Sequence, residues 1–163
     1  MGSADVPVTA GVRVLRAKNI PFVPHLYAFE EHGGTRHSAE ALGVDEHAVV
    51  KTIVFQTEAK QPLIALMHGD REISAKELAR IIGVRKIEPC DERSALKFTG
   101  YQFGGTSPFG TRTPIPVYAE KSIFALPKIY INGGKRGFLV EIDPREMRKA
   151  FPVTEVEVGI TAS

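Results

Sequence analysis

Two glycine-rich segments in the second half of the chain limit what it can fold into. Residues 98–110 read Phe-Thr-Gly-Tyr-Gln-Phe-Gly-Gly-Thr-Ser-Pro-Phe-Gly, and residues 132–137 read Asn-Gly-Gly-Lys-Arg-Gly. Such segments are poor core material, but glycine lets a backbone pass close to a ligand and point successive N–H groups at one acceptor. Apolar runs at 129–131 and 138–140 flank the second segment. We therefore expect 132–137 to be a loop between two strands, and 98–110 to be a ligand-binding backbone.

The hydrophobic pattern predicts an α/β fold: one compact domain over residues 1–163, with a mixed central β-sheet surrounded by short helices and a flexible stretch at 1–7. Residues 30–37 are expected to be a mobile connection, and 153–160 an edge strand. Helices are predicted at 8–18, 38–42, 74–82, 91–96 and 144–150, and strands at 23–29, 51–56, 62–67, 116–119, 129–131 and 138–142.

Capping signals mark three of these helices. Ser74 and Glu77 form a capping box, Asp91 precedes the fourth helix, and Asp143 stands before Pro144 at a first helical position. These local signals fix where the helices begin.

Composition indicates a soluble globular protein, with 43% hydrophobic and 25% charged residues among 163. The single cysteine, Cys90, excludes an internal disulfide. No apolar run reaches the roughly 20 residues of a membrane span, and the first residues show no signal-peptide pattern, so we expect a cytoplasmic protein without a membrane partner. The net charge of +2 leaves two interpretations of the basic residues in the second half: contacts with a phosphate-bearing partner, or a solvated surface of mixed sign.

The strand at 51–56 carries a lysine on an apolar face. Strict alternation places Lys51 with Ile53 and Phe55, and Thr52 with Val54, on opposite faces. Lys51 either extends its ammonium to water or is held at the rim of a pocket for an anionic group.

The sequence gives little support for a serine or cysteine nucleophile or for a metal site. Ser107 lies outside a Gly-x-Ser-x-Gly pattern and precedes proline, which favours extended backbone over a nucleophile elbow. Cys90 has no histidine nearby in sequence, so a buried structural thiol is favoured over a catalytic one. The five histidines show no metal-ligand spacing, and we expect no metal and no organic cofactor.

The N–H groups of Gly104, Gly105 and Thr106 could converge on a carbonyl oxygen. Each such donor stabilises an oxyanion by about 3 kcal/mol in acyl-transfer sites, which would suit ester cleavage. A glycine-rich hairpin or bulge is the alternative interpretation.

Three motifs in order resemble the YbaK/EbsC family of free-standing aminoacyl-tRNA deacylases, relatives of the editing insertion of prolyl-tRNA synthetases. The motifs are Val50-Lys51-Thr52, Thr99-Gly100-Tyr101 with Gly104-Gly105-x-Ser107-Pro108-x-Gly110, and Gly133-Gly134-Lys135-Arg136-Gly137. The resemblance covers roughly residues 10–155. It implies the family's α/β editing fold and a trans-editing hydrolase that cleaves the aminoacyl ester of mischarged tRNA for proline. The implied ligand is the tRNA acceptor end, and prolyl-tRNA synthetase is a candidate partner.

The resemblance also implies roles for individual residues. Lys51 matches the lysine tied to activity and to the acceptor end, and Gly104 and Gly105 match the loop against the scissile ester. In members acting on cysteinyl-tRNA, the thiol of the substrate attacks its own ester, so the enzyme supplies orientation and electrostatics. The residues expected to contact substrate are Tyr27, Thr106, Ser107, Asn132, Gly133, Gly134 and Leu139, and those expected to contact tRNA phosphates are Lys135 and Arg136. Alternatively, Tyr27 is an amphipathic strand residue, and the two cations are solvated turn charges.

One position departs from the family pattern. Cysteinyl-type members commonly carry an aspartate where this chain has Leu139, with Glu141 two residues further on. Cysteinyl, alanyl, seryl and threonyl esters therefore all stay open as substrates. Two other functions also stay open: a non-catalytic tRNA- or synthetase-binding module of the same fold, and a binder or hydrolase of a small phosphate metabolite with Gly133-Gly134-Lys135 as its anion site.

Overall fold

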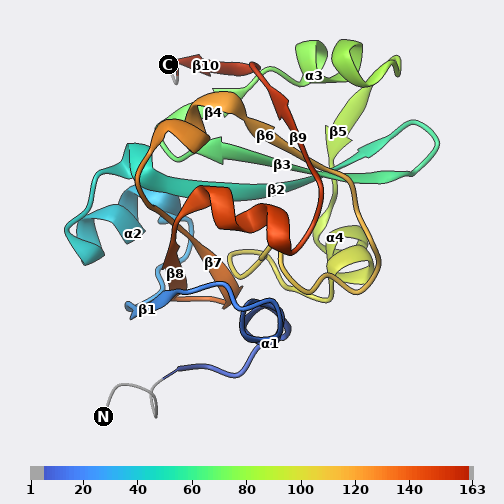
Figure 1. Cartoon of the computed structure of the whole chain (residues 1–163). Coiled ribbons are helices and arrows are strands. Elements are labelled where there is room, and N and C mark those ends of the chain that lie inside the picture. The colour runs from blue at the N-terminus through green and yellow to red at the C-terminus, as the bar shows by residue number, and fades with distance from the viewer. Residues whose placement is uncertain (1–5, 162–163) are drawn as a thin grey trace.

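An eight-stranded mixed sheet organises residues 6–161, the part of the chain that the computed structural model describes (Figure 1). Residues 1–5 of the stretch 1–7 expected to be flexible lie outside the described residues. In order across the sheet the strands are β1 (Val23–Leu26), β8 (Phe138–Ile142), β7 (Ile129–Lys135), β2 (Val49–Thr57), β3 (Pro62–His68), β6 (Val117–Glu120) and β9 (Val153–Val156), and β5 (Ile87–Pro89) also pairs with β2. A separate two-stranded sheet joins β4 (Arg71–Ile73) to β10 (Gly159–Thr161).

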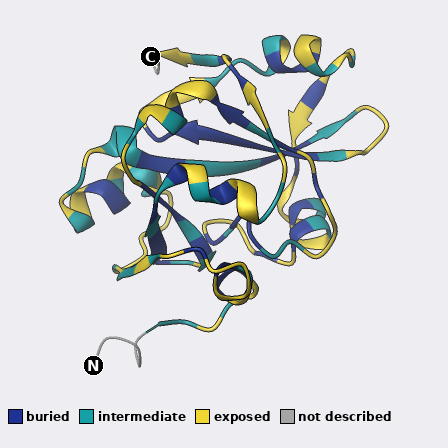
Figure 2. Cartoon of the chain, in the orientation of Figure 1, coloured by how far each residue is buried: buried dark blue, intermediate teal, exposed yellow. Residues whose placement is uncertain are grey.

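Helices cover both faces of the main sheet, and their outward sides are exposed (Figures 1 and 2). One face packs against α1 (Ala10–Ala17), α4 (Glu92–Thr99) and two short 3₁₀ helices, η3 (Lys121–Ala125) and η4 (Pro144–Lys149). The other face packs against α3 (Ala75–Ile82) and, next to it, α2 (Gly34–Leu42), while the 3₁₀ helix η2 (Glu46–Ala48) leads into β2. The single compact α/β domain with a mixed sheet is therefore as predicted.

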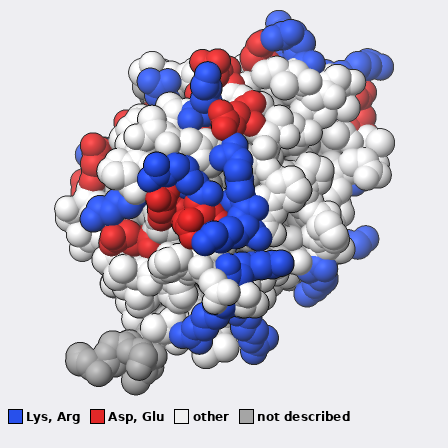
Figure 3. Space-filling model, in the orientation of Figure 1, with Lys and Arg blue, Asp and Glu red and all other residues white. Residues whose placement is uncertain are grey.

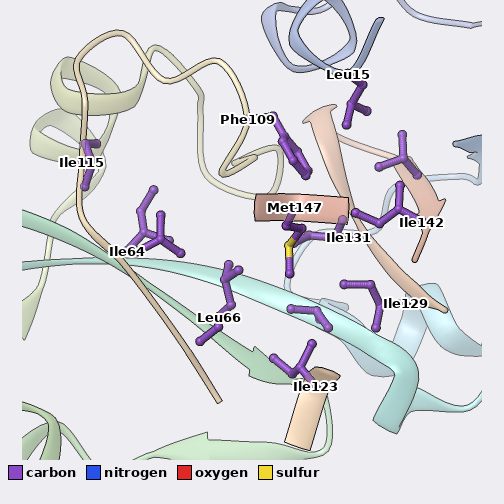
Figure 4. Packing of buried hydrophobic residues seen from close by; sticks show 14 of the residues in the cluster. Leu15, Ile64, Leu66, Phe109, Ile115, Ile123, Ile129, Ile131, Ile142 and Met147 are labelled. Atoms are coloured by element: carbon purple, nitrogen blue, oxygen red, sulfur yellow. The ribbon is translucent and has the colours of Figure 1, made fainter. Parts of the chain in front are cut away.

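The buried apolar side chains form three clusters, and the largest of them lies beneath α1 and η4. Figure 4 shows Phe109, Ile131 and Met147 packed together there, with Ile64 and Leu66 of β3 below them. All five side chains are almost fully buried. Because close-packed interiors resist deformation, this cluster gives the sheet a rigid frame from which loops can present functional groups.

The predicted helix caps and the alternation of side chains in β2 are both found in the structure. The side chains of Ser74, Asp91 and Asp143 each accept a hydrogen bond from a backbone N–H of the helix that follows, at 3.2, 2.8 and 2.9 Å. The alternation in β2 is also confirmed, because Val54 packs into the cluster beneath η4 whereas Phe55 packs into the cluster beneath α3.

Several boundaries differ from the prediction, and three of them lie near the two glycine-rich segments or the segment between β1 and α2. Residues 30–37 are not a mobile connection throughout, because α2 begins at Gly34. β1 ends at Leu26 rather than at residue 29. β7 continues through a bulge to Lys135, so that the loop expected over 132–137 is a tight turn. Glycines obscure the start of α2 and the end of β7, since glycine is a weak former of both helix and strand.

The tail forms two strands instead of one. Glu120 is buried and accepts hydrogen bonds from the N–H groups of Val158 and Gly159, at 2.8 and 3.1 Å. This contact lies between β9, at the edge of the main sheet, and β10, in the small sheet. The short strands β4 and β5 were also not predicted, because three residues are too few to show alternation.

The edge of β2 that faces β7 is open in its middle. β7 pairs with β2 at Val49 and Val50, and β5 pairs with it at 55–57. Within residues 6–161, no strand pairs with this edge of β2 at 51–54. The opposite edge is fully paired, with seven register partners on β3. The sheet therefore leaves a gap beside Lys51.

Candidate functional site

A cavity of about 650 Å³ lies at the open edge of β2. Its walls come from β2, the segment between β1 and α2, the start of α4, the loop after α4, and the strands β7 and β8 with their turn. The predicted site residues that line it are Tyr27, Lys51, Gly104, Thr106, Asn132, Arg136 and Leu139. Those that do not line it are Gly105, Ser107, Gly133, Gly134 and Lys135. The chemical role of each residue stays a prediction.

Lys51 places a cation in this cavity. Its side chain is half-buried, and burial lowers the pKa of its ammonium below the usual lysine value, while the carboxylates of Glu72, Glu46 and Asp70 act in the opposite direction. Throughout residues 6–161, no carboxylate lies within 4.0 Å of its Nζ, although seven other lysine and arginine side chains have a carboxylate within that distance. A half-buried ammonium with no carboxylate in ion-pair distance can pair with an anionic ligand.

The loop after α4 contributes fewer groups than its sequence suggested. Gly104 and Thr106 line the cavity, but the N–H of Gly105 donates to the carbonyl of Gln102 at 3.0 Å. A Cβ at Gly105 would lie 2.8 Å from the backbone nitrogen of Arg136. Gly105 therefore lets this loop pack tightly on the β7–β8 turn, and the three-donor cradle expected from Gly104, Gly105 and Thr106 does not form in this structure.

Ser107 is fully buried behind this loop. Its Oγ accepts a hydrogen bond from the N–H of Phe109 at 3.0 Å. A hydroxyl enclosed in this way fixes the turn before Phe109 and has no access to the cavity.

Asn132 connects the two glycine-rich segments. Its side-chain amide donates to the carbonyl of Gly104 at 3.1 Å and accepts from the N–H groups of Gly134 and Lys135 at 2.6 and 3.1 Å. Gly133 and Gly134 lie behind the cavity wall, where an added Cβ would clash with the rings of Phe138 and Tyr101 respectively. Asn132 thus faces the ligand space, while the two glycines allow close packing.

The two predicted tRNA-binding cations differ in their surroundings. Lys135 is exposed and lies outside the cavity lining. Arg136 lines the cavity, donates from Nε to the carbonyl of Phe103 at 2.8 Å, and places its guanidinium 4.9 Å from the centre of the Phe29 ring. Arg136 is therefore held in one orientation, whereas Lys135, at the end of β7, extends into solvent.

One end of the cavity is apolar. Leu139 is 4% exposed and packs with Ala39, Val49 and Tyr130, and Tyr27 contacts the same cluster. Burial raises the pKa of the Tyr27 hydroxyl above its usual value, opposed by a hydrogen bond from Ser38. At this end the cavity fits a small, weakly polar group.

Glu141 does not replace the family's aspartate at the cavity. Its carboxylate pairs with His25 at 2.8 Å and Lys128 at 3.4 Å, and it is not part of the lining. The hydrogen bond from His25 lowers the pKa of this carboxyl below its usual value, assisted by Lys128.

Comparison with known proteins gives the family. Residues 32–150 match the family model described as "Aminoacyl-tRNA editing domain". The chain belongs to this family. The resemblance to YbaK/EbsC proteins seen in the three sequence motifs is thereby confirmed.

Two sequence relatives and one solved structure are similar to this editing domain. The domain is 29% identical over 137 residues to an Enterococcus faecalis protein named "Putative Cys-tRNA(Pro)/Cys-tRNA(Cys) deacylase EbsC", which covers 83% of this chain and 84% of that protein. It is 26% identical over 131 residues to a proline–tRNA ligase of Desulfotalea psychrophila, covering 79% of this chain but 22% of the ligase. A crystal structure described as "a putative trans-editing enzyme for prolyl tRNA synthetase" superposes with a TM-score of 0.80 at 21% identity, covering 97% of this chain and 100% of that chain, and so shows the shared fold.

The sequence did not reveal several residues that line the cavity of this editing domain. Thr52 belongs to the opposite face of β2 by alternation, yet it borders the cavity, and its buried hydroxyl is without a hydrogen-bond partner in the described structure. Cys90 also borders the cavity, and burial raises the pKa of its thiol to about 11, so that the thiol is protonated at neutral pH. Phe29 and Phe103 line the cavity while 38% and 42% exposed. Thr52 and Cys90 lie beside the open edge of β2, and Phe29 and Phe103 come from loops that pack across it, an arrangement that depends on tertiary structure rather than on local sequence.

Charges elsewhere on the editing domain form a mixed surface. Figure 3 shows basic and acidic side chains side by side on the face that carries η4. Arg145 pairs with Asp143, and Arg148 with Glu155. On this face, Arg145 and Arg148 are therefore partly solvated and paired with carboxylates.

Within residues 6–161, no helix combines the length and apolar character needed to cross a bilayer. In the same range, no three His, Cys, Asp or Glu side chains converge as they would around a metal ion.

Proposed function

We propose that this editing domain is a trans-acting deacylase that hydrolyses the ester between a mischarged amino acid and the terminal ribose of a tRNA. The proposed substrates are tRNA for proline carrying cysteine, alanine, serine or threonine. Support comes from the name of the Enterococcus faecalis relative and from the similarity to proline–tRNA ligases. Prolyl-tRNA synthetase is the proposed partner, and the cytoplasm the proposed location.

One observation carries the proposal: Lys51 of β2 and Gly104 of the loop after α4 line the same cavity. A cation without a counter-ion can hold the anionic 3′ end of a tRNA, since a partly buried charge interacts more strongly than a solvated one. A glycine beside it lets the backbone approach an ester that a Cβ would hold away. Orientation and charge together are the main contributions an enzyme can make to ester cleavage.

Water is the proposed nucleophile for substrates without a thiol. Ser107 is enclosed and outside the cavity lining, and the Cys90 thiol is protonated. In the proposed reaction, water adds to the ester carbonyl and the carbon–oxygen bond to ribose breaks. The products are a free amino acid and a tRNA with its terminal hydroxyl restored, so all atoms are accounted for.

The apolar end around Leu139 and Tyr27 is the proposed site of the amino acid side chain. The charged side chains of Glu30, Glu31 and Glu92 also line the cavity and can attract the α-ammonium of the amino acid. An apolar wall separates substrates that differ by one methylene by only about 1–3 kcal/mol. We therefore expect activity on more than one small amino acid.

The test is a panel of tRNAs for proline charged with cysteine, alanine, serine, threonine or proline, followed by loss of label with purified protein. The proposal expects release from at least one mischarged tRNA, faster than from prolyl-tRNA. Binding of the same tRNAs without release would contradict it and would identify a non-catalytic module of the same fold.

A further inference from the structure

Two exposed aromatic rings lie at the same cavity. Among residues 6–161, the exposed large hydrophobic side chains include two aromatic ones, Phe29 and Phe103, and both line the cavity. They come from separate segments, one after β1 and one after α4. Since exposed apolar rings lose the stabilisation that burial would give, two of them at one cavity mark a ligand contact.

Arg136 contacts both phenylalanines. Its Nε donates to the backbone carbonyl of Phe103 at 2.8 Å, and its guanidinium lies 4.9 Å from the centre of the Phe29 ring. A guanidinium over an aromatic face is a favourable cation–π contact. The three residues, hereafter the aromatic rim, are therefore linked before any ligand binds.

Backbone geometry holds the aromatic rim in place. Gly104, which follows Phe103, has a φ of +83°, and a Cβ there would lie 2.9 Å from the ring of Phe29. The carbonyl of Gly104 in turn accepts a hydrogen bond from Asn132 at 3.1 Å. Glycine at 104 thus permits the close approach of the two segments, and Asn132 fixes it.

The chemistry of the aromatic rim matches an unpaired nucleobase. Aromatic faces and a planar guanidinium both stack on bases, and stacking of this kind is how proteins bind single-stranded nucleic acid. An arginine can also donate to a phosphate oxygen with the N–H groups left free. The base of an aminoacylated nucleotide is joined through one ribose to the ester, so it must lie just beyond the cavity that holds the aminoacyl group.

We infer that Phe29, Phe103 and Arg136 form a nucleobase subsite that stacks the unpaired terminal base of the substrate's 3′ end. This inference rests on the proposed function, because the aminoacyl group in the cavity determines where the base lies. It changes the role of Arg136 from a phosphate contact alone to a planar stacking group, and it assigns no contact to the exposed Lys135.

The test measures stacking without catalysis. The probe is the single-stranded trinucleotide CCA with 2-aminopurine in place of the terminal adenine, because stacking quenches the fluorescence of this base. The wild-type protein and Phe103→Tyr should quench it. The double variant Phe29→Leu, Phe103→Leu, which keeps apolar bulk but has no rings, should bind about tenfold or more weakly and leave the fluorescence near its free value.

Leu96→Ala is the matched control, since Leu96 is also an exposed hydrophobic residue, 45% accessible, but lies outside the cavity lining. It should quench like the wild type. Thermal unfolding of each variant shows whether the fold is kept, and Phe103→Tyr shows that an aromatic ring is sufficient. Equal quenching by the double variant and the wild type would overturn the inference, as would binding of the probe by the wild type without any quenching.

The two proposals fail in different ways. If the wild type quenches the probe but releases no amino acid from any charged tRNA, the deacylase proposal fails and the nucleobase subsite stands. If it deacylates tRNA but neither quenches the probe nor loses efficiency in the double variant, the subsite fails and the deacylase stands.

Discussion

Two basic side chains lie one position apart on the β2–β3 ladder, and their surroundings differ. Lys51 is paired in register with Met67, and His68 with Val50. His68 is fully buried, and its ring nitrogens are hydrogen-bonded to the carbonyl of His47 and to Ser122, both at 2.7 Å. Lys51 faces the cavity without a carboxylate within ion-pair distance in the described structure.

This difference separates a structural group from a functional one. A buried polar group with all its partners supplied by the protein stabilises the fold and has nothing left to offer a ligand. A half-buried charge without a partner lowers the stability of the fold. Proteins retain such charges at sites where a bound ligand supplies the partner. We therefore assign His68 to structure and Lys51 to the proposed deacylation, and the predictions below test this assignment.

Lys51→Ala should abolish most of the activity. Loss of a group that acts on developing charge lowers kcat/KM by about a hundredfold or more, while the fold should be unchanged, because the lysine makes no ion pair. Deacylation kinetics on the best tRNA of the panel measure the effect. Lys76→Ala, at an exposed position on α3, is the control and should match the wild type. Unchanged turnover in Lys51→Ala would remove Lys51 from the mechanism.

His68→Ala should lower the stability of the protein and leave its activity nearly unchanged. It empties a fully buried site and leaves the hydrogen-bonding groups of His47 and Ser122 without their partner, which should lower the free energy of unfolding by about 2–4 kcal/mol. Urea denaturation measures the loss, and deacylation per folded molecule at low temperature should stay near that of the wild type. A variant that remains stable but is inactive would place His68 in the site.

The stability of the protein should fall at mildly acidic pH because of His68. Burial lowers the pKa of this imidazole. A hydrogen bond to the His47 carbonyl and the charge of Asp70 oppose this shift, whereas His47 and Arg71 add to it. The unfolded chain then binds a proton at a higher pH than the folded protein does. The stabilisation is complete above the unfolded value of about 6.5 and decreases as the pH falls through the lower folded value. Denaturation midpoints between pH 5 and 8 should show this slope, and His68→Gln should flatten it; an equal slope in both proteins would contradict the assignment.

Lys51→Met should stabilise the protein while inactivating it. Methionine fills similar space beside Ile53 without a half-buried charge, and substitutions of this kind commonly add about 0.5–1 kcal/mol. Thermal unfolding of Lys51→Met, compared with that of the control variant Lys76→Met, measures the gain in stability. A destabilised Lys51→Met would indicate that the ammonium already has a partner in the free protein.

Thr52→Val should give a smaller gain. The hydroxyl of Thr52 is buried without a hydrogen-bond partner among the described residues, and removal of an unsatisfied polar group of similar shape is worth up to about 1 kcal/mol. The comparison is with Thr154→Val, an exposed threonine on β9 that is also in a strand. Equal effects of the two substitutions would show that the Thr52 hydroxyl is not deprived of partners.

Features set by neighbouring residues could be predicted from the sequence. The caps at Ser74, Asp91 and Asp143 involve contacts within three residues, and the alternation that places Lys51 on the face of Ile53 follows from strand geometry alone. The family motifs then pointed to one candidate cavity, since Lys51 and Gly104 both line it.

Features that depend on the order of the strands in the sheet could not be predicted from the sequence. The open edge of β2 exists because β7 separates from it after Val50, and nothing in the sequence of either strand shows this. The contact of Arg136 with Phe29 joins segments far apart in the chain. Within one motif, Gly104 faces the cavity and its neighbour Gly105 faces the β7–β8 turn, a distinction that residue type does not carry.

The ionisation of Lys51 tests the account most directly. Its pKa can be followed by NMR titration of carbon-13 at the Cε position, in the free protein and with a terminal dinucleotide that carries the amino acid through a stable amide. The account predicts a free value below the ordinary value of a lysine side chain, because burial opposes the charge, and a rise on binding, because the phosphate supplies the missing partner. An ordinary free value, unchanged by the ligand, would contradict it.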